Sequence, residues 1–282
     1  MFKRITIIII IAFCSIGSML AQDFEGPDTV SVHSSDLILK ALLWRPLGKG
    51  PFATVIFCLG SYTSTDSIHD PIREASVLGP LFARRGYVYL ALFRRGVSIS
   101  KGQGLNSADL MENAFKHNGQ EGRNEVQLKQ LETAQLQDML AGLFYLRKRP
   151  DVDKQRMAIA GHSFGGSLTL LVAEHDPGLK AVVVFSGAGY SWNQSPMLRS
   201  RLISAVKNIK APIMIIHAQN DYSTTPGYVL DSVMNRLNKP HLLKIYPNSG
   251  NSANEGHNII FLSTQTWEGD VFKFLEENLK SY

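Results

Sequence analysis

Short, uninterrupted apolar runs recur along this chain, and segments with helical spacing separate them. The clearest runs are ATVIFCL at 53–59, YVYLALF at 87–93, Met157–Ala160, Ala181–Phe185 and Ile213–His217. A strand that is buried on both faces of a sheet has such a run, because neither side-chain direction meets solvent. The alternation of these strands with helices predicts an α/β fold in which helices flank a mostly parallel sheet.

Further segments bring the predicted sheet to eight strands. Thr29–His33 and Leu37–Trp44 alternate apolar and polar residues around a short polar turn, which predicts an antiparallel hairpin. Leu242–Tyr246 is the last predicted strand. The segment Arg94–Arg123 contains glycines and shows little periodicity, and the main predicted helices cover 72–86, Glu125–Arg149 and about Thr264–Leu279. No long linker interrupts this series, so residues 22–282 are predicted to form one domain.

The first residues differ from the rest of the chain. Lys3 and Arg4 precede an apolar run of sixteen residues, which ends at Leu20-Ala21 before the polar stretch QDFEGPD. A basic start, a short apolar core and a small residue at the cleavage position are typical of a secretory signal peptide. We therefore expect residues 1–21 to be a signal peptide and the mature chain to be secreted or periplasmic, free of the membrane. A retained membrane-anchoring helix is the alternative.

Composition and charge narrow the class of protein further. Hydrophobic residues make up 44% and charged residues 19% of the chain, which is typical of a globular protein. Loss of Lys3 and Arg4 with the signal peptide lowers the formal net charge from +5 to +3, which argues against nucleic acid as a partner. Cys58 is the one cysteine outside the signal peptide, so we expect no intrachain disulfide and interpret Cys58 as a buried small side chain.

The stretch MAIAGHSFGGSLTLLVAEH at 157–175 places Ser163 where a predicted strand gives way to a predicted helix. Gly161 and Gly165 remove side chains where the strand and the helix approach each other closely. In this context the G-x-S-x-G pattern is that of a nucleophile elbow, which exposes the serine hydroxyl at the carboxyl edge of the sheet. Ser163 is therefore the candidate nucleophile, and a tight turn without a catalytic role is the alternative.

A serine nucleophile needs a histidine base, and the base needs a carboxylate that orients it. His257 lies in the polar stretch NSGNSANEGHN after the last predicted strand, in a predicted loop at the same edge of the sheet. Asp221 follows the strand Ile213–His217 closely and precedes a helix that is predicted to start near Pro226. We expect Ser163, Asp221 and His257 to form a catalytic triad. His69 is a further candidate pocket residue, and His217 is interpreted as a core residue.

The developing oxyanion needs backbone N–H donors. Phe164, directly after the nucleophile, is expected to supply one of them. Ser61, in CLGSYTSTD after an apolar run, is expected to supply the other, with Tyr62 as the neighbouring alternative. Metal ligation is not indicated, because the sequence has neither an H-E-x-x-H motif nor a cysteine cluster.

The stretches VDKQRMAIAGHSFGG, IIHAQNDYSTTP, EGH and LFRRGVSISKGQG together resemble the α/β-hydrolase superfamily, near its dienelactone hydrolase and prolyl-oligopeptidase-like branches. The resemblance covers about Val30 to Leu279. It implies an α/β-hydrolase fold, Ser163 as nucleophile with Asp221 and His257 as partners, and no cofactor. Relatives often have His-Gly where this chain has Leu59-Gly60, and the chain is too short to include the N-terminal propeller of prolyl oligopeptidases.

We expect an exported serine hydrolase that cleaves a small-molecule ester through an acyl-enzyme intermediate. A small peptidase or amidase with the same triad is one alternative, and a catalytically silent binding module is another. Pocket walls are expected from Tyr62, from Arg94–Arg123 and from GAGYSWNQSPMLRS at 187–200, including Tyr190 and Trp192. Arg94 or Arg95 either contacts an acidic substrate or forms a salt bridge within its loop. The sequence leaves the oligomeric state open.

Overall fold

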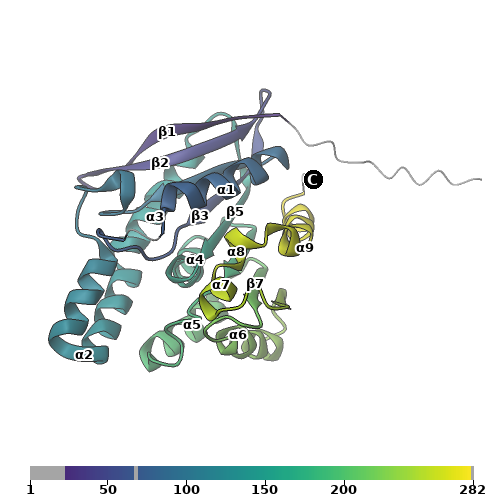
Figure 1. Ribbon diagram of the computed structural model, residues 1–282. Helices are drawn as coiled ribbons and strands as arrows, with labels where there is room; N and C mark the ends of the chain where they lie inside the picture. Colours follow the sequence, from purple (N-terminus) through teal and green to yellow (C-terminus); the bar gives the residue numbers. More distant parts are fainter. Residues whose placement is uncertain (1–22, 67–68, 281–282) are drawn as a thin grey trace, which may run out of the picture.

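The computed structural model describes residues 23–66 and 69–280 of the chain (Figure 1). Within these residues, eight strands form one sheet in the order β1-β2-β4-β3-β5-β6-β7-β8. The prediction of an eight-stranded α/β-hydrolase sheet is confirmed. The strands are β1 (Phe24–Ser34), β2 (Leu37–Pro46), β3 (Phe52–Cys58), β4 (Val88–Phe93), β5 (Val152–His162), β6 (Ala181–Phe185), β7 (Ile213–Ala218) and β8 (His241–Tyr246).

The pairing of the strands indicates at which edge of the sheet a functional site lies. β1 and β2 form the predicted antiparallel hairpin, and β2 also pairs antiparallel with β4. The pairs from β4-β3 through to β7-β8 are parallel. The strand order reverses between β3 and β5, and ligands of α/β proteins bind at the carboxyl ends of strands beside such a reversal. The segments after β3 and β5 therefore meet where a site is expected.

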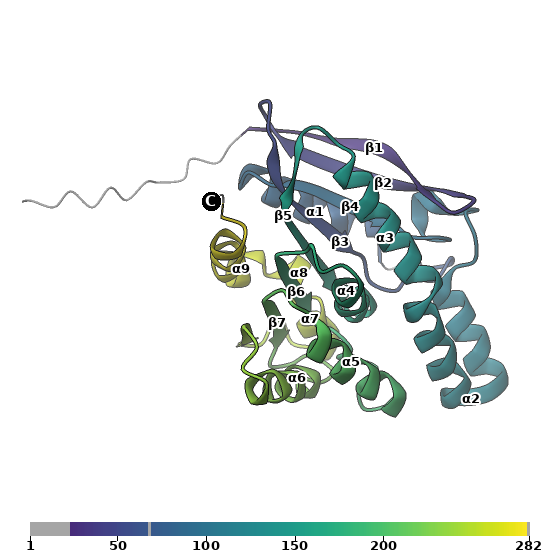
Figure 2. The same cartoon turned by 180° about the vertical axis from the view of Figure 1, so that it is seen from behind.

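Helices cover both faces of the sheet (Figures 1 and 2). One face packs against α1 (Pro71–Arg84), α8 (Ile259–Leu262) and α9 (Thr264–Asn278). The other face packs against α3 (Ala134–Arg147), α4 (Phe164–His175), α5 (Pro196–Asn208) and α6 (Thr225–Arg236). Alternate side chains of β3 serve the two cores: Val55 and Phe57 pack on the first side, and Ile56 and Cys58 on the second. Cys58 is buried as predicted, and burial raises the pKa of its thiol to about 11.

The segment Arg94–Arg123 is more helical than its sequence indicates. After a short 3-10 helix (Ser98–Ser100), α2 (Ser107–Glu132) begins where the side chain of Asn106 accepts hydrogen bonds from two backbone N–H groups. Gly119, at φ 64°, kinks α2, and a break at Thr133 separates it from α3. The single helix predicted over Glu125–Arg149 is therefore wrong. The helix α2 projects from the body of the molecule (Figure 1), so it buries little apolar surface against the rest of the protein. Its sequence therefore lacks the regular stripe of apolar residues that a helix packed on a core shows.

The predicted signal peptide, residues 1–21, lies outside the described residues. Among the residues that are described, no helix is both long and apolar enough to span a bilayer. Export and signal cleavage stay predictions from the sequence.

Candidate active site

Ser163 lies on a sharp turn between β5 and α4. Its backbone has φ 57° and ψ −119°, an unusual conformation for a residue with a side chain, and its N–H donates to Phe185 O of β6 at 2.9 Å. Glycine is required beside it: a Cβ atom on Gly165 would meet the carbonyl oxygens of Cys58 and Leu59, and one on Gly161 would meet Gly165 O. The close approach of β3, β5 and α4 thus holds Ser163 in a strained elbow.

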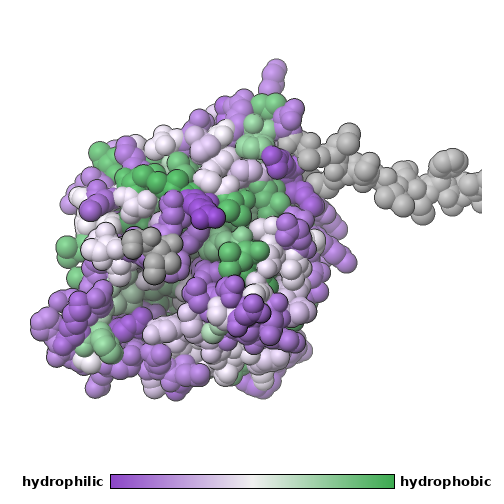
Figure 3. All heavy atoms as spheres, viewed as in Figure 1, coloured by the Kyte–Doolittle hydropathy of each residue, from purple (hydrophilic) through white to green (hydrophobic). Residues whose placement is uncertain are grey.

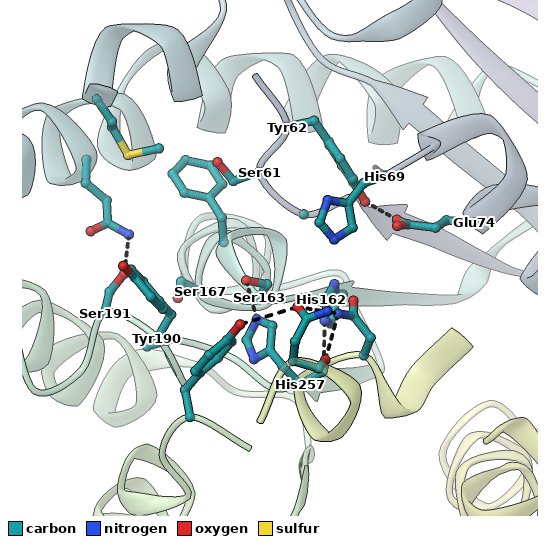
Figure 4. Close-up of a pocket in the computed structure, with 18 of the residues that line it drawn as sticks. Ser61, Tyr62, His69, Glu74, His162, Ser163, Ser167, Tyr190, Ser191 and His257 are labelled. Atoms are coloured by element: carbon teal, nitrogen blue, oxygen red, sulfur yellow. Dashed lines mark hydrogen bonds between the residues drawn. The ribbon is translucent and has the colours of Figure 1, made fainter. Parts of the chain in front are cut away.

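The structure brings the three predicted triad side chains within hydrogen-bond distance of one another, and Figure 4 shows Ser163 and His257 of these three. His257 Nε2 lies 2.8 Å from Ser163 Oγ, and His257 Nδ1 lies 2.7 Å from Asp221 Oδ1. Asp221 and His257 are 8% and 6% exposed, so water competes little for these bonds. An imidazole that donates from Nδ1 to a carboxylate has its Nε2 lone pair available for the serine proton. The arrangement is therefore competent for nucleophilic catalysis.

Asp221 has more hydrogen-bond donors than the sequence indicates. Oδ1 also accepts from the backbone N–H of Tyr222 at 2.7 Å, and Oδ2 accepts from His217 Nδ1 at 2.7 Å. Burial by itself would raise the pKa of the Asp221 carboxyl, but the hydrogen bonds from His217 and His257 outweigh it and hold that pKa below its usual range. Asp221 therefore stays ionised, which suits a group that must stabilise a protonated His257.

Two side chains hold the backbone of His257 in place by hydrogen bonds to its carbonyl oxygen. His257 was expected in a loop, whereas it ends the short helix α7 (Ala253–His257), which Ser252 and Glu255 cap. Its carbonyl oxygen accepts from Ser186 Oγ at 2.8 Å and from His162 Nε2 at 2.9 Å. Burial lowers the pKa of His162 to about 3, with the nearby His257 as a second cause, so His162 is neutral and its Nε2 carries the donated proton.

The two residues predicted to supply the oxyanion donors line the same pocket as Ser163 and come from different elements. Phe164 is the first residue of α4, where helical N–H groups have no partner within the helix. Ser61 follows β3 and lines the pocket together with Gly60. Arg94, 1% exposed, donates from Nη1 to Leu59 O at 2.7 Å and from Nη2 to Gly60 O at 2.8 Å. Because C=O and N–H point in opposite directions in a trans peptide, the bond to Gly60 O turns the N–H of Ser61 away from Arg94.

Arg94 and Arg95 bind the protein rather than a substrate. Arg94 Nε donates to Gln135 Oε1 at 2.7 Å, and burial lowers the pKa of its guanidinium. Arg95 forms an ion pair with the buried Asp138, with Nη2 2.7 Å from Oδ1. Of the two alternatives that the sequence leaves open, Arg95 forms a salt bridge, but its partner Asp138 belongs to α3 and not to the loop of Arg95 as predicted.

Ser163 opens into a pocket of about 170 Å³. Its walls come from the three predicted segments: the β3–α1 connection, α2, and the turn after β6. Tyr190 and His69 line the pocket, whereas Trp192 is 2% exposed and belongs to the core. The principal lining side chains are those of Tyr62, His69, Glu74, Met111, Arg123, Gln127, Ser167, Tyr190, Ser191, Tyr222 and Asn254.

Arg123 of α2 is a cation in this pocket without an acidic partner among the described residues. Its buried Nη1 has no hydrogen-bond partner within residues 23–66 and 69–280, and the same holds for Gln127 Oε1 and Ser167 Oγ. The guanidinium carbon lies 5.7 Å from the ring centre of Tyr190, and burial lowers the pKa of Arg123. A half-buried, unpaired guanidinium in a pocket is costly for the free protein and suits an anionic ligand.

Tyr62 and Glu74 form a hydrogen-bonded pair on the other side of Ser163 (Figure 4). Tyr62 OH donates to Glu74 Oε2, and both residues line the pocket of Ser163. Burial raises the pKa of Glu74 to about 7. This pair connects the segment after β3 to α1.

Sequence reasoning missed three residues of the site. His217 was interpreted as a core residue, and it is fully buried, yet it also donates to Asp221. His162 holds the His257 carbonyl, and Arg123 lies in a segment that showed no periodicity. The spacing of four residues between His217 and Asp221 was the one available signal. Among the described residues, no group of three or more His, Cys, Asp or Glu side chains is arranged to hold a metal ion.

Comparison with known proteins gives one family match. The model of the dienelactone hydrolase family matches residues 74–262. A curated protein of Methylorubrum extorquens strain AM1, "putative carboxymethylenebutenolidase", is 21% identical over 269 residues, which cover 93% of this chain and 84% of that protein.

Solved structures support the same fold. The acylaminoacyl peptidase of Pyrococcus horikoshii has a TM-score of 0.65 at 21% identity, over 92% of this chain. This chain covers 42% of that larger protein. A putative dienelactone hydrolase of Klebsiella pneumoniae has a TM-score of 0.63 at 19% identity, over 89% of this chain and 98% of that one. At these identities the likeness to the structures concerns the fold.

Proposed function

This chain belongs to the dienelactone hydrolase family, and we propose that it is a serine hydrolase that cleaves small carboxylic esters with Ser163, His257 and Asp221. The observation that carries the proposal is the continuous hydrogen-bond chain from Asp221 Oδ1 through His257 to Ser163 Oγ at a strained elbow. A series of hydrogen bonds in this order supplies a nucleophile, the base that deprotonates it and the carboxylate that orients the base.

The proposed reaction has two steps. As Ser163 Oγ bonds to the ester carbonyl carbon, His257 Nε2 takes its proton, and the N–H groups of Phe164 and Ser61 donate to the oxyanion. The carbon–oxygen bond to the alcohol then breaks, and His257 returns the proton to the leaving alcohol. In the second step His257 deprotonates a water molecule that attacks the acyl-serine, and the carboxylic acid leaves as Ser163 regains its proton.

The pocket favours a compact substrate with an anionic group. Its volume of about 170 Å³ suits a small acyl group. Arg123 offers an unpaired guanidinium, and Gln127 and Ser191 lie beside it in the same wall. A carboxylate is the group that a guanidinium recognises best, because two N–H groups can donate to two oxygens. We therefore propose that an ester with a free carboxylate is preferred over a neutral one.

A peptidase or amidase with the same triad is the second candidate, since structural neighbours include a peptidase. Esters are favoured because an alkoxide leaves more readily than an amine, and a peptide also needs a groove that holds an extended backbone. Rates with one acyl group presented as a nitrophenyl ester, an alkyl ester and an amide, together with dipeptides, compare the two directly. A dipeptide that is cleaved more efficiently than every ester would favour the peptidase.

Labelling with a fluorophosphonate probe tests whether Ser163 is the nucleophile. Labelling of the wild type would also exclude a catalytically silent binding module. The wild type and a control variant, Ser76→Ala on the exposed side of α1, should both be labelled. Ser163→Ala should be neither labelled nor active, because the probe reacts with an activated serine hydroxyl. Equal labelling of Ser163→Ala and the wild type would remove Ser163 from its role.

We also propose that the enzyme acts outside the cytoplasm, which rests on the sequence of residues 1–21 alone. Expression of the full chain in a bacterial host, followed by N-terminal sequencing of the periplasmic protein, tests this. A mature N-terminus at Gln22 is the expected result. An uncleaved protein in the membrane fraction would favour the retained anchor over cleavage, and full-length protein in the cytoplasmic fraction would contradict export.

A further inference from the structure

A second hollow opens beside the catalytic pocket, between α1 and α8. It has a volume of about 260 Å³, and its lining residues are His69, Asp70, Arg73, Glu74, Val77, Asn254, Asn258, Phe261 and Leu262. We call it the α1–α8 groove. Its outer wall is apolar and open to solvent, since Leu262 is 60% and Val77 38% exposed. Figure 3 shows an apolar area over α8 and beside α1 in the middle of the viewed face.

The groove continues the catalytic pocket rather than forming a separate site. His69, Glu74, Asn254 and Asn258 line both hollows. The ring of Phe261 lies edge-on to His162, with ring centres 5.1 Å apart, and His162 in turn packs against His257 at 5.0 Å. A ligand bound at Ser163 can therefore extend into the groove over a continuous surface.

The side on which His257 lies decides which part of an ester enters the groove. His257 must give its proton to the leaving alcohol, so the alcohol oxygen lies on the His257 side of Ser163. Asn254 and Asn258, which flank His257 in sequence, form the boundary between the pocket and the groove. Arg123 and Ser191 line the catalytic pocket but not the groove, and Ser191 lies on the opposite side of Ser163 from His69 and Glu74 (Figure 4).

We propose that the α1–α8 groove is the alcohol subsite and that it binds an apolar alkyl chain of the leaving alcohol. This inference rests on the proposed function, and it divides the substrate into a small acyl part near Arg123 and a hydrophobic alcohol part over Val77, Phe261 and Leu262. Exposed apolar side chains beside an active site are a cost to solubility that a hydrophobic substrate would offset by covering them.

Acetate esters of ethanol, butanol, hexanol and octanol test the assignment, because all four give the same acetyl-enzyme. The alcohol then affects only the acylation step, so kcat/KM should rise with chain length, about two- to threefold per added methylene until the groove is filled. This is below the roughly fourfold expected for a methylene that becomes fully buried. Deacylation, measured as the limiting kcat where hydrolysis of the acetyl-enzyme is slow, should be the same for all four.

The variant Leu262→Ser, and Val77→Ser as a second one, should lower the ratio of kcat/KM for hexyl over ethyl acetate by about three- to tenfold. Both side chains are exposed, so the fold should be retained. The matched control is Leu237→Ser, which is 48% exposed at the end of α6 and far from the groove in sequence; it should keep the wild-type ratio.

The possible failures are distinguishable. No turnover of any ester by the wild type overturns the proposed function and the subsite with it. Turnover that is independent of alcohol length, or a hexyl preference that Leu262→Ser leaves intact, overturns the subsite alone. The subsite is also overturned if Leu262→Ser removes the dependence of kcat/KM on acyl-chain length in a series of ethyl esters. The groove would then hold the acyl part of the substrate. Concentration-dependent dimerisation that Leu262→Ser abolishes, without an effect on alcohol preference, would make the groove a contact between two copies of this chain.

Discussion

His217 Nδ1 lies 2.7 Å from Asp221 Oδ2, so the carboxylate that orients His257 is itself held by a second histidine. The two side chains are fully buried, and His217 Nε2 has no hydrogen-bond partner among the described residues. The proton of His217 is therefore on Nδ1, and both oxygens of Asp221 have an imidazole donor.

His217→Leu should lower kcat/KM about 10- to 100-fold, the equivalent of about 1.5–3 kcal/mol for a lost hydrogen bond to a charged group. His217→Asn should restore part of the rate, because its amide can donate to the same oxygen. Steady-state kinetics on a short-chain ester measures both variants. Equal activity of His217→Leu and the wild type would mean that the second histidine serves packing alone.

Arg94→Lys should lower kcat far more than it changes KM, because a single ammonium nitrogen cannot reproduce the bonds that two guanidinium nitrogens of Arg94 donate to Leu59 O and Gly60 O. Loss of one oxyanion donor typically costs about 100- to 1,000-fold in kcat, which sets the upper limit. The affinity for a boronic acid transition-state analogue should fall in parallel. Arg95→Gln is the control: it loses the ion pair with Asp138 and should lower stability while it keeps kcat. Parallel losses of kcat in both variants would indicate a purely structural role for Arg94.

Arg123→Met should lower kcat/KM for mono-4-nitrophenyl succinate about 10- to 100-fold and leave 4-nitrophenyl butyrate within about twofold, because only the first substrate has a carboxylate for the guanidinium. Lys116→Met removes one positive charge from the exposed side of the same helix, where Lys116 pairs with Glu112. That control should spare both substrates. Equal effects of Arg123→Met on the two esters would exclude an anion subsite at Arg123.

Glu74→Gln should make stability less dependent on pH. The pKa of Glu74 is raised from 4.5 to about 7 by burial, so the folded protein retains a proton that the unfolded chain releases. The contribution of Glu74 to the free energy of unfolding is fully present below pH 4.5 and is lost as pH rises through about 7. Urea unfolding at pH 5 and pH 8 should show that Glu74→Gln gains stability relative to the wild type at pH 8 only. The exposed Glu121→Gln should show no such difference, and a gain of equal size at both pH values would contradict the assignment.

Ser163→Gly should be inactive yet more stable than Ser163→Ala, by about 1 kcal/mol. The backbone at Ser163 has φ 57° and ψ −119°, which glycine adopts without strain and alanine does not. Thermal or urea unfolding of the two inactive variants measures the difference. If Ser163→Ala were equally stable, the elbow would store no strain at this residue.

Local patterns were sufficient for most of the architecture. The central strands β3, β4, β6 and β7 are predictable because they are buried on both faces, and a continuous apolar run such as ATVIFCL meets that requirement. The hairpin strands β1 and β2 are predictable from their alternation of apolar and polar residues. The elbow at Ser163 is equally local, since the glycines that permit it are its neighbours in sequence. The part of α2 before Glu125 is not predicted, because α2 projects from the body of the molecule and a helix that buries little surface leaves no apolar stripe in its sequence.

The sequence alone determined the eight strands, the order of Ser163, Asp221 and His257, and the edge of the sheet at which they meet, because these follow from apolar periodicity and turn chemistry within short segments. Only the tertiary structure decided which polar side chains find partners. His217 bonds to Asp221 through the turn after β7, and Arg94 at the end of β4 bonds to the carbonyls of Leu59 and Gly60 at the end of the neighbouring β3. Arg123 is left without a counter-charge among the described residues. Hydrogen bonds and ion pairs act over about 3 Å, so they depend on how distant segments pack, and that information is absent from any local pattern.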